Sequence, residues 1–463
     1  MSLFGFEKQN STKDSTRRNP WLRLVVAFAV CIGLFLWLPV VGANGQDSSG
    51  KAQDPKQEKS DNPDEKIARP KVFDAPMDFS KPPEIGEIKG PTEAEIRVAI
   101  DRGVQFLLKT QNKDGSWGSH VTRRDFEIFA PIPGAHHAFR AATTSLCVSA
   151  MLENRADDSE CRVAIKKALD FMLEKLPKLK RATGDAIYNV WGHAYAIQAL
   201  VRLRKWEHVD DATKKKIDDL IKQQLDMLYR YESIDGGWGY YDFNAQTRKP
   251  SGSSISFVNA TVLVAMYEAK QAGIEPKEKI VKRAIAAIKR QQKKDFTYLY
   301  GEYLKNVPMM GINRPGGSLG RSQACNIALR MWEDKKQITD NVIKHWLYRL
   351  YVRNGWLSMG RKRPVPHESW MAVAGYFYFY GHYYAGLNVD ALPQDDRAPY
   401  QAMLAKIMLR HQEKNGCWWD YTLYSYHQQY GTAYALMTLE RCLPDKKESD
   451  DKGASNENAG GKK

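Results

Sequence analysis

The chain has 463 residues, a formal charge of +15 and 43% hydrophobic residues. This is enough apolar material to bury a sizeable core, in two or three average domains or one large repeat domain. The basic charge would suit nucleic acid, anionic lipid or acidic polysaccharide, but the lysines and arginines are spread over helix faces, which favours solvated surfaces. Five of the six cysteines follow the N-terminal apolar run without a Cys-x-x-Cys spacing, so a disulfide framework or cysteine-rich zinc site is not expected.

The N-terminal segment has the pattern of an export signal. Polar and basic residues 1–23 precede an apolar run at 24–41, and small residues at 41–43 have signal-cleavage spacing. The run is long for a signal core and short for a spanning helix, so residues 1–43 are predicted to be a signal peptide or a retained membrane anchor. Either alternative places the folded part in the periplasm or on the extracytoplasmic face of the membrane, which excludes nucleic acid as a partner.

Two segments are expected to lack a packed structure. Residues 44–90 are rich in Lys, Asp, Glu, Pro, Ser and Gln and carry aromatic residues only near their end. They are predicted to be a disordered linker, and residues 444–463 to be a disordered tail.

The first strong pattern after the linker is a helix that ends in a turn and a tryptophan. Thr92 and Glu95 have the spacing of a capping box, and apolar residues from Ile96 to Leu108 share one helical face. Gln111, an Asp-Gly turn and Trp117 follow. Weaker copies of this turn occur at 235–239, 354–356 and 412–418. The residues of the repeated structural motif are Gln111, Asp114, Gly115, Trp117, Gly236, Trp238, Gly355, Trp356, Gln412, Gly416 and Trp418.

Twelve helical patterns of two alternating kinds fill residues 91–443. One kind has a charged face, at about 94–111, 159–176, 211–230, 276–292, 337–353 and 398–412. The other is apolar nearly all round, at about 141–153, 191–203, 256–269, 321–333, 368–385 and 430–442. Alternation predicts six hairpins, each with an outer and an inner helix. No polar capping hairpin is visible, so the prediction is an all-α fold, a closed (α/α)6 toroid in two concentric layers.

The 102–117 stretch resembles the QW repeat of squalene-hopene and oxidosqualene cyclases. It agrees at Arg102 and Gly103, at the Phe106–Leu107 pair, at Gln111, and at Gly115 and Trp117. The resemblance implies the α/α toroid that triterpene cyclases share with protein prenyltransferase β subunits, and complement-type thioester domains are similar in fold.

The catalytic motifs of those families are missing. The sequence has no Asp-x-Asp-Asp acid motif, no Asp-x-Cys zinc pair and no Cys-Gly-Glu-Gln thioester. No family catalytic residue can therefore be carried over, and no cofactor or metal is expected.

Three polar residues remain candidates for catalysis. Asp420, beside Trp418 and Trp419, is the best candidate acid, because an aromatic pocket would raise its pKa. Asp242 and His427 are the others. The alternative for the two aspartates is a turn or cap carboxylate, and for a lone inner-helix histidine it is a hydrogen-bonded structural role.

Candidate ligand-binding residues lie near the expected ends or along the inner helices. The aromatic residues could bind apolar surface or stabilise a cation, whereas packing of the inner-helix core is the alternative. They are His193, Tyr195, Trp191, His367, Tyr376, Tyr380, Trp419 and Tyr426.

Two functions fit this sequence. The first is a binding or scaffold toroid, which holds an apolar, isoprenoid-like ligand or a protein partner and is attached to a membrane through the N-terminal segment. The second is a divergent enzyme on the same fold, either terpene cyclase-like or a lyase or hydrolase of acidic polysaccharide, for which the positive charge would be suitable.

Overall fold

The computed structural model describes residues 77–121, 133–242, 249–251, 253–333 and 335–444. All of them belong to one compact unit, Arg69–Lys463. The predicted signal or anchor at 1–43, most of the linker and nearly all of the tail lie outside the described residues. Within the described ranges, no helix has both the length and the apolar composition required to cross a membrane.

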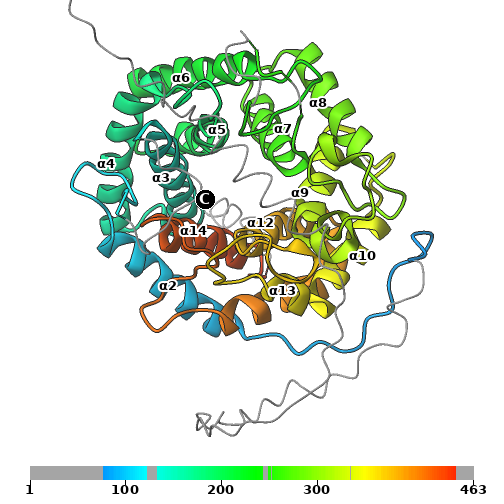
Figure 1. The fold of residues 1–463 in the computed structure, drawn as a ribbon. Coiled ribbons are helices and arrows are strands. Elements are labelled where there is room, and N and C mark those ends of the chain that lie inside the picture. The colour runs from blue at the N-terminus through cyan, green and yellow to red at the C-terminus, as the bar shows by residue number, and fades with distance from the viewer. Residues whose placement is uncertain (1–76, 122–132, 243–248, 252, 334, 445–463) are drawn as a thin grey trace, which may run out of the picture. The chain divides into compact units, whose positions relative to one another are not determined.

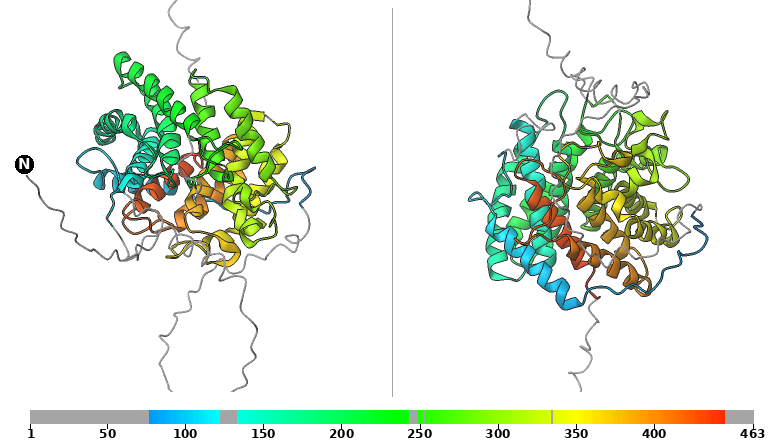
Figure 2. Two further views of the ribbon diagram at one scale, coloured as in Figure 1. Left: turned by 45° about the horizontal axis from the view of Figure 1, so that its top comes forward. Right: turned by 60° about the horizontal axis from the view of Figure 1, so that its bottom comes forward.

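The unit is a double ring of helices, as the sequence predicts (Figure 1). The outer layer contains α2 (Glu93–Lys109), α4 (Ser159–Lys175), α6 (Asp211–Arg230), α8 (Glu278–Gln291), α10 (Asp340–Val352) and α13 (Gln394–Arg410). The inner layer contains α3 (Pro133–Arg155), α5 (Asn189–Lys205), α7 (Ser256–Gln271), α9 (Pro315–Glu333), α12 (Phe377–Asp390) and α14 (His427–Glu440). Figure 2 shows the two layers from two further directions.

The ring closes on itself. Each inner helix packs against the next, and the last of them, α14, packs against the first, α3. In the outer layer α13 contacts α2, and α2 also packs on α14. The closed toroid that the alternation of helix types predicts is confirmed.

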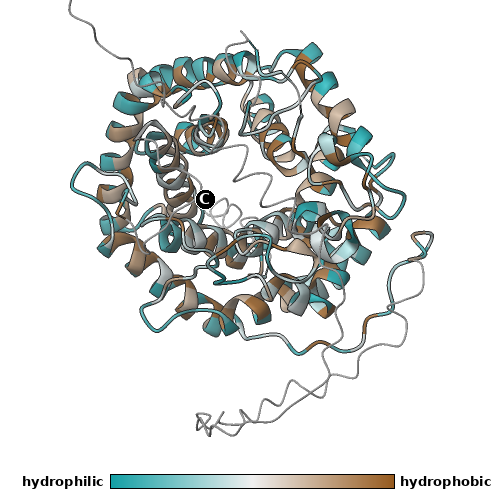
Figure 3. Cartoon of the chain, in the orientation of Figure 1, coloured by the Kyte–Doolittle hydropathy of each residue, from teal (hydrophilic) through white to brown (hydrophobic). Residues whose placement is uncertain are grey.

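Figure 3 colours the ring by hydropathy, and the burial of the two layers follows their compositions. Outer helix α8 buries one stripe, which includes Val281, Ala284 and Ile288, and exposes its charged face. Inner helix α5 is buried without interruption from Gly192 to Val201. Because an apolar helix needs neighbours on every side, it occupies the inner ring, while a striped helix covers it.

The repeated tryptophan turn has one geometry in three places. The indole nitrogens of Trp117, Trp238 and Trp418 each donate to a helix carbonyl ten residues earlier, at 2.8 Å. All three rings are completely buried. Each tryptophan therefore satisfies a carbonyl near the C-terminal end of its outer helix and covers that end with an apolar ring.

Two of the turns also join one outer helix to the next through a glutamine. The Gln111 side chain donates to its own turn and to the Ala164 carbonyl of α4, at 2.8 Å. Gln412 makes the equivalent bond to the Ala99 carbonyl of α2, at 2.9 Å, so the same contact closes the ring. Arg102 strengthens this closure by donating to Gln412 and to two carbonyls of the final turn.

One copy of the turn was not recognised in the sequence. Asp295 accepts from the Thr297 amide as Asp114 does from Ser116, and a bridge joins Gln292 to Tyr298 as one joins Gln111 to Trp117. Phe296 replaces the turn glycine at a φ of 59°, and Tyr298 replaces the tryptophan. Both replacements removed the residue types by which the motif was recognised.

The expected copy at 354–356 is wrong. Gly355 and Trp356 lie in the short helix α11 (Asn354–Ser358), and Gly355 is not among the residues with positive φ. The chain does not reverse there, and Trp356 instead stacks near Trp370, with ring centroids 5.4 Å apart. Asn-Gly tolerates a turn, but it does not prevent a helix from continuing.

Three predicted helix starts also need correction, and one of them, at 321–333, begins earlier, at Pro315. The pattern at 141–153 begins earlier, at Pro133, because its first turns contain histidines and an arginine that hid the apolar pattern. The pattern at 368–385 begins later, at Phe377. The segment before it contains a 3-10 turn, Trp370–Ala372, in which Met371 and Ala372 have positive φ.

Replacing Gly416 with alanine tests how much the closing turn contributes. Gly416 has a φ of 91°, and a Cβ there would lie 2.4 Å from the Arg102 carbonyl oxygen of α2. Gly416→Ala should therefore lower the free energy of unfolding by about 2 kcal/mol or more, measured by urea denaturation. The matched control is Gly355→Ala, because nothing lies within 4 Å of a Cβ there. Equal losses in both variants would contradict this role of the turn.

Candidate functional site

Aromatic side chains gather where the turns lead into the inner helices. Tyr188 precedes α5, Tyr240 and Tyr241 follow the Trp238 turn, and Tyr300 follows the Tyr298 turn. Ring centroids lie 5.7 Å apart for Tyr188–Tyr240 and 4.9 Å apart for Tyr240–Tyr241. We call this group the aromatic mouth; its members are Tyr188, Trp191, Tyr240, Tyr241, Phe257, Tyr300, Tyr303, Tyr376 and Phe377.

The hydroxyls of the mouth form a directed chain of hydrogen bonds. His367 Nδ1 donates to the Ala372 carbonyl at 2.8 Å, so Nε2 accepts, and the Tyr376 hydroxyl donates to it at 2.9 Å. Tyr300 then donates to Tyr376 at 3.4 Å, and Tyr240 donates to Tyr300. Burial lowers the pKa of His367 to about 4, so the ring is neutral and keeps this direction near neutral pH.

A buried cation lies beside this chain. Arg321 of α9 is fully buried and donates to the carbonyls of Gly317, Tyr298 and Ile312. Its guanidinium lies 5.4 Å from the Tyr300 ring centroid. Within the described residues no carboxylate pairs with Arg321, and its Nε has no hydrogen-bond partner. Burial lowers its pKa to about 10, which leaves it charged at neutral pH.

Below the mouth, tyrosines from several inner helices fill the hub. Tyr434 of α14 donates to Tyr195 of α5 at 2.5 Å. Tyr384 of α12 donates to Thr261 of α7 at 2.9 Å, and Tyr383 donates to Gln198 of α5 at 3.2 Å. The tyrosines are at most 6% exposed. These tyrosines and their hydrogen-bonded hydroxyls fill the centre of the ring.

Charged residues join the C-terminal ends of the inner helices. Arg202 of α5 pairs with Glu153 of α3 at 2.7 Å and with Glu268 of α7 at 2.5 Å. Arg441, directly after α14, pairs with Glu153 at 2.6 Å and with Asp390 of α12 at 2.8 Å. Despite the cost of burial, the two arginines hold the pKa of Glu153 down at about 2. This network ties five inner elements together at the end of the hub away from the mouth.

The structure gives Asp420 the contacts of a helix cap. Its carboxylate accepts from the Phe379 amide in the first turn of α12 and from the Tyr430 hydroxyl, both at 3.0 Å. The side chain is fully buried, and burial raises its pKa to about 7. The raised pKa expected of a general acid is present, but both oxygens are engaged within the fold.

The other two catalytic candidates also bond within the fold. Asp242 pairs with Arg181 at 3.2 Å and accepts from the Ser251 hydroxyl at 3.0 Å. His427 donates through Nδ1 to the Tyr424 carbonyl at 2.9 Å. A catalytic role for these residues remains a prediction.

His193 links two layers of the ring. Its Nδ1 donates to Gln224 of α6 at 2.6 Å, and its Nε2 accepts from Asn189 at 3.2 Å. Burial lowers its pKa to about 4. Both ring nitrogens are engaged, which is the geometry of a structural histidine.

The remaining predicted binding residues separate into three places. Trp191, His367 and Tyr376 are half-buried at the mouth or its hydrogen-bond chain. Tyr195 and Tyr380 are buried in the hub. Trp419 and Tyr426 lie outside both places. The Lys362 ammonium lies 4.4 Å from the Trp419 ring centroid, and the Tyr426 ring lies against Gly118.

The sequence reasoning missed Arg321 and most of the mouth tyrosines. A signal was available for Tyr240 and Tyr241, because they follow the Trp238 turn by two and three residues. Tyr300 follows Tyr298 by two residues, but that turn was not recognised. Arg321 begins the predicted inner helix 321–333, and this position was the available signal that it is buried.

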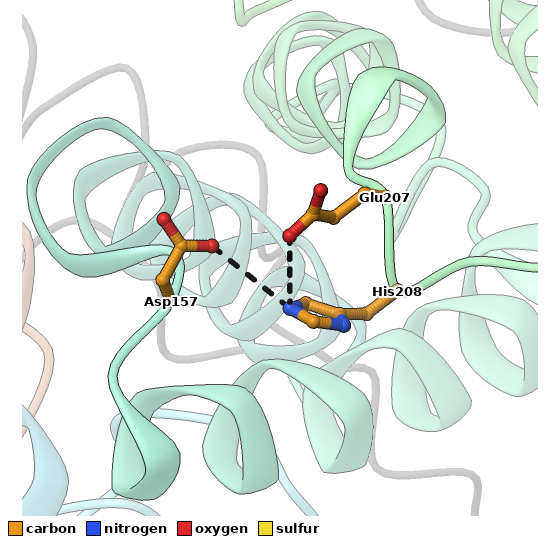
Figure 4. A group of neighbouring side chains, drawn as sticks. All are labelled: Asp157, Glu207 and His208. Carbon is orange, nitrogen blue, oxygen red and sulfur yellow. Dashed lines mark ion pairs between the residues drawn. The ribbon is translucent and has the colours of Figure 1, made fainter.

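Among the residues that the structure describes, one group of side chains has the composition of a metal site. His208 Nε2 lies 3.6 Å from a Glu207 oxygen and 3.9 Å from an Asp157 oxygen (Figure 4). The side chains of Glu207 and Asp157 are 76% and 84% exposed. We therefore describe the group as a surface cluster of ion pairs and assign no metal to it.

Comparisons with known proteins agree with the ring. A model of the squalene-hopene cyclase C-terminal domain matches residues 83–306. The chain is 27% identical over 215 residues to the lanosterol synthase of Pneumocystis carinii, which covers 42% of this chain and 28% of that protein. A 24% identical match over 131 residues to the alpha-2-macroglobulin of Thermotoga maritima covers 28% of this chain and 8% of that protein. The chain thus spans less than a third of either relative.

Solved structures give low-identity matches. The type II terpene cyclase of Scytonema is 13% identical, with a TM-score of 0.45 over 76% of this chain and 99% of that chain. The GH76A alpha-1,6-mannanase of Salegentibacter is 10% identical, with a TM-score of 0.48 over 76% of this chain and 100% of that chain. The observed double ring, the family model and the lanosterol synthase match support a relationship to the α/α toroids of the terpene cyclase and protein prenyltransferase superfamily.

The pH dependence of stability tests the environment of Asp420. Its pKa is raised from 3.8 to about 7 on folding, so its stabilising contribution is full below about pH 4 and is lost as the pH rises through about 7. Asp420→Asn has no proton to lose. Relative to Asp420→Asn, the wild type should therefore lose about 4 kcal/mol of unfolding free energy between about pH 4 and about pH 8. A difference that stays constant with pH in urea denaturation would contradict burial of this carboxyl.

Proposed function

We propose that the toroid is a binding domain that holds an apolar, isoprenoid-like ligand at the aromatic mouth. One observation carries the proposal: the mouth tyrosines bond to one another through their hydroxyls, and Tyr240, Tyr241 and Tyr376 remain partly exposed. Tyr303 is 48% exposed there, and Trp191 and Tyr241 are half-buried. Ring surface of this kind gains most from covering apolar groups.

The internal contacts of the candidate acids favour binding over catalysis. A general acid must reach the atom that it protonates, but both oxygens of Asp420 bond to groups of the fold. Asp242 is paired with Arg181. Because tyrosines fill the hub below the mouth, the proposed ligand lies on the exposed rings of the mouth rather than deep within the toroid.

Trp191 and Tyr303 are the residues whose loss should weaken binding most. The probe is a polyprenol added to the purified full chain, with the midpoint of thermal unfolding and the quenching of intrinsic fluorescence as readouts. Trp191→Ala and Tyr303→Ala should each weaken binding about ten-fold, because each removes a large ring from the contact.

The control for these variants is Tyr229→Ala. Tyr229 is an aromatic residue of outer helix α6 that lies under Lys277, away from the mouth, so its loss should leave the affinity unchanged. If the wild-type chain shows neither stabilisation nor quenching with a polyprenol, and its solvent extract contains no lipid, the ligand proposal fails.

A further inference from the structure

Exposed apolar side chains concentrate on two segments of the toroid. Eleven large hydrophobic residues are exposed in the described part of the chain, and seven of them lie in 302–314 or 359–371. The first segment carries Tyr303, Val307, Met309 and Met310, and the second carries Met359, Val365 and Trp370. We call these seven residues the loop patch. Its members are between 40% and 64% exposed, which is unusual for residues of this size gathered together.

The two segments touch, so the patch is one surface. A Cβ on Gly311 would lie 3.4 Å from the backbone of Met371, and one on Gly316 would lie 3.2 Å from the Trp370 ring. The 3-10 turns η5 (Gly311–Asn313) and η6 (Trp370–Ala372) contact each other. Each segment leads into the start of an inner helix, α9 or α12, so the patch lies on the side of the ring that carries the mouth.

Basic groups accompany the apolar ones. Arg314 donates to the Met309 carbonyl at 2.8 Å, and Arg363 donates to the Met359 carbonyl at 3.1 Å, which holds each guanidinium beside an exposed methionine. Lys305 is exposed in the first segment. Arg361 and Lys362 bring the cations of the two segments to five, against the carboxylates of Glu302 and Glu368. Lys362 is paired with Glu413, and Glu302 is paired with Arg290.

We propose that the loop patch docks on an anionic lipid surface. Tryptophan, tyrosine and methionine side chains would enter the boundary between headgroups and acyl chains, and the arginines and lysine would contact lipid phosphates. Tyr303 belongs to both the mouth and the patch, but the other six members of the patch lie outside the mouth, so lipid docking does not depend on the ligand proposed there.

The point at which the chain enters the toroid favours a lipid surface over a protein partner. The first described residue, Met77, contacts Arg349 through its sulfur at 3.6 Å. Arg353 follows Arg349 by four residues, about 6 Å along the helix. Its guanidinium lies over the Trp356 ring, and Trp356 packs on Trp370 of the patch. The 76 residues before Met77 include the apolar run 24–41. The described chain therefore begins near the patch, and the apolar run precedes that point in the sequence.

Hydrogen exchange of the full chain tests the proposal with a readout confined to the patch. The chain is mixed with vesicles of phosphatidylcholine alone or of phosphatidylcholine with phosphatidylglycerol. Amides of 302–314 and 359–371 should exchange about ten-fold more slowly with the anionic vesicles, whatever the N-terminal segment does. No slowing in these segments overturns the proposal, and so does equal slowing by both kinds of vesicle.

Two pairs of variants separate the contributions. Met309→Asp with Trp370→Asp should abolish the slowing, whereas Val98→Asp with Val163→Asp, at residues 59% and 56% exposed on outer helices, should preserve it. Lys305→Ala should raise the lipid concentration needed for half-maximal slowing about five-fold. Slowing that appears without lipid and grows with protein concentration would assign the patch to a second copy of the chain and overturn lipid docking.

Discussion

The contact on which the toroid depends is the tryptophan turn that joins one outer helix to the next. A buried tryptophan bonds back to its own helix, a turn glycine lies against the backbone of the neighbouring helix, and a glutamine reaches a carbonyl of that helix. The same three contacts recur between the last outer helix and the first, through Trp418, Gly416 and Gln412. Since the contact is identical within the ring and at its closure, no end needs a special cap.

Closure organises the interior into three levels. The inner helices start at an aromatic mouth, cross a layer of tyrosines whose hydroxyls bond between helices, and end in a network of buried ion pairs. Arginines at these C-terminal ends, such as Arg202 and Arg441, also suit the negative end of the helix dipole. Most of the exposed large hydrophobic residues in the described part of the chain lie in the loops beside the mouth, and both proposed contacts, with ligand and with lipid, lie on that side of the ring.

The sequence predicted the ring because its determinants are local and periodic. Burial stripes and the Gln111–Trp117 turn depend on residues close in the chain, so the layers and closure were correct. The site depends on residues that only the fold brings together. Tyr240, Tyr300 and Tyr376 come from three different loops, and Arg321 is identified by the carbonyls around it. The reading of 354–356 failed because Asn-Gly permits a turn without requiring one.

Native-state hydrogen exchange of helices α2 and α14 tests ring closure most directly. In a closed ring the first and last helices are interior elements, so their slowest amides should open with the same free energy as those of α7 across the ring. In an open arc these helices would be terminal, and they would exchange through fraying at a much lower free energy than α7. Equal protection is the expected result, and early exchange confined to α2 and α14 would contradict closure.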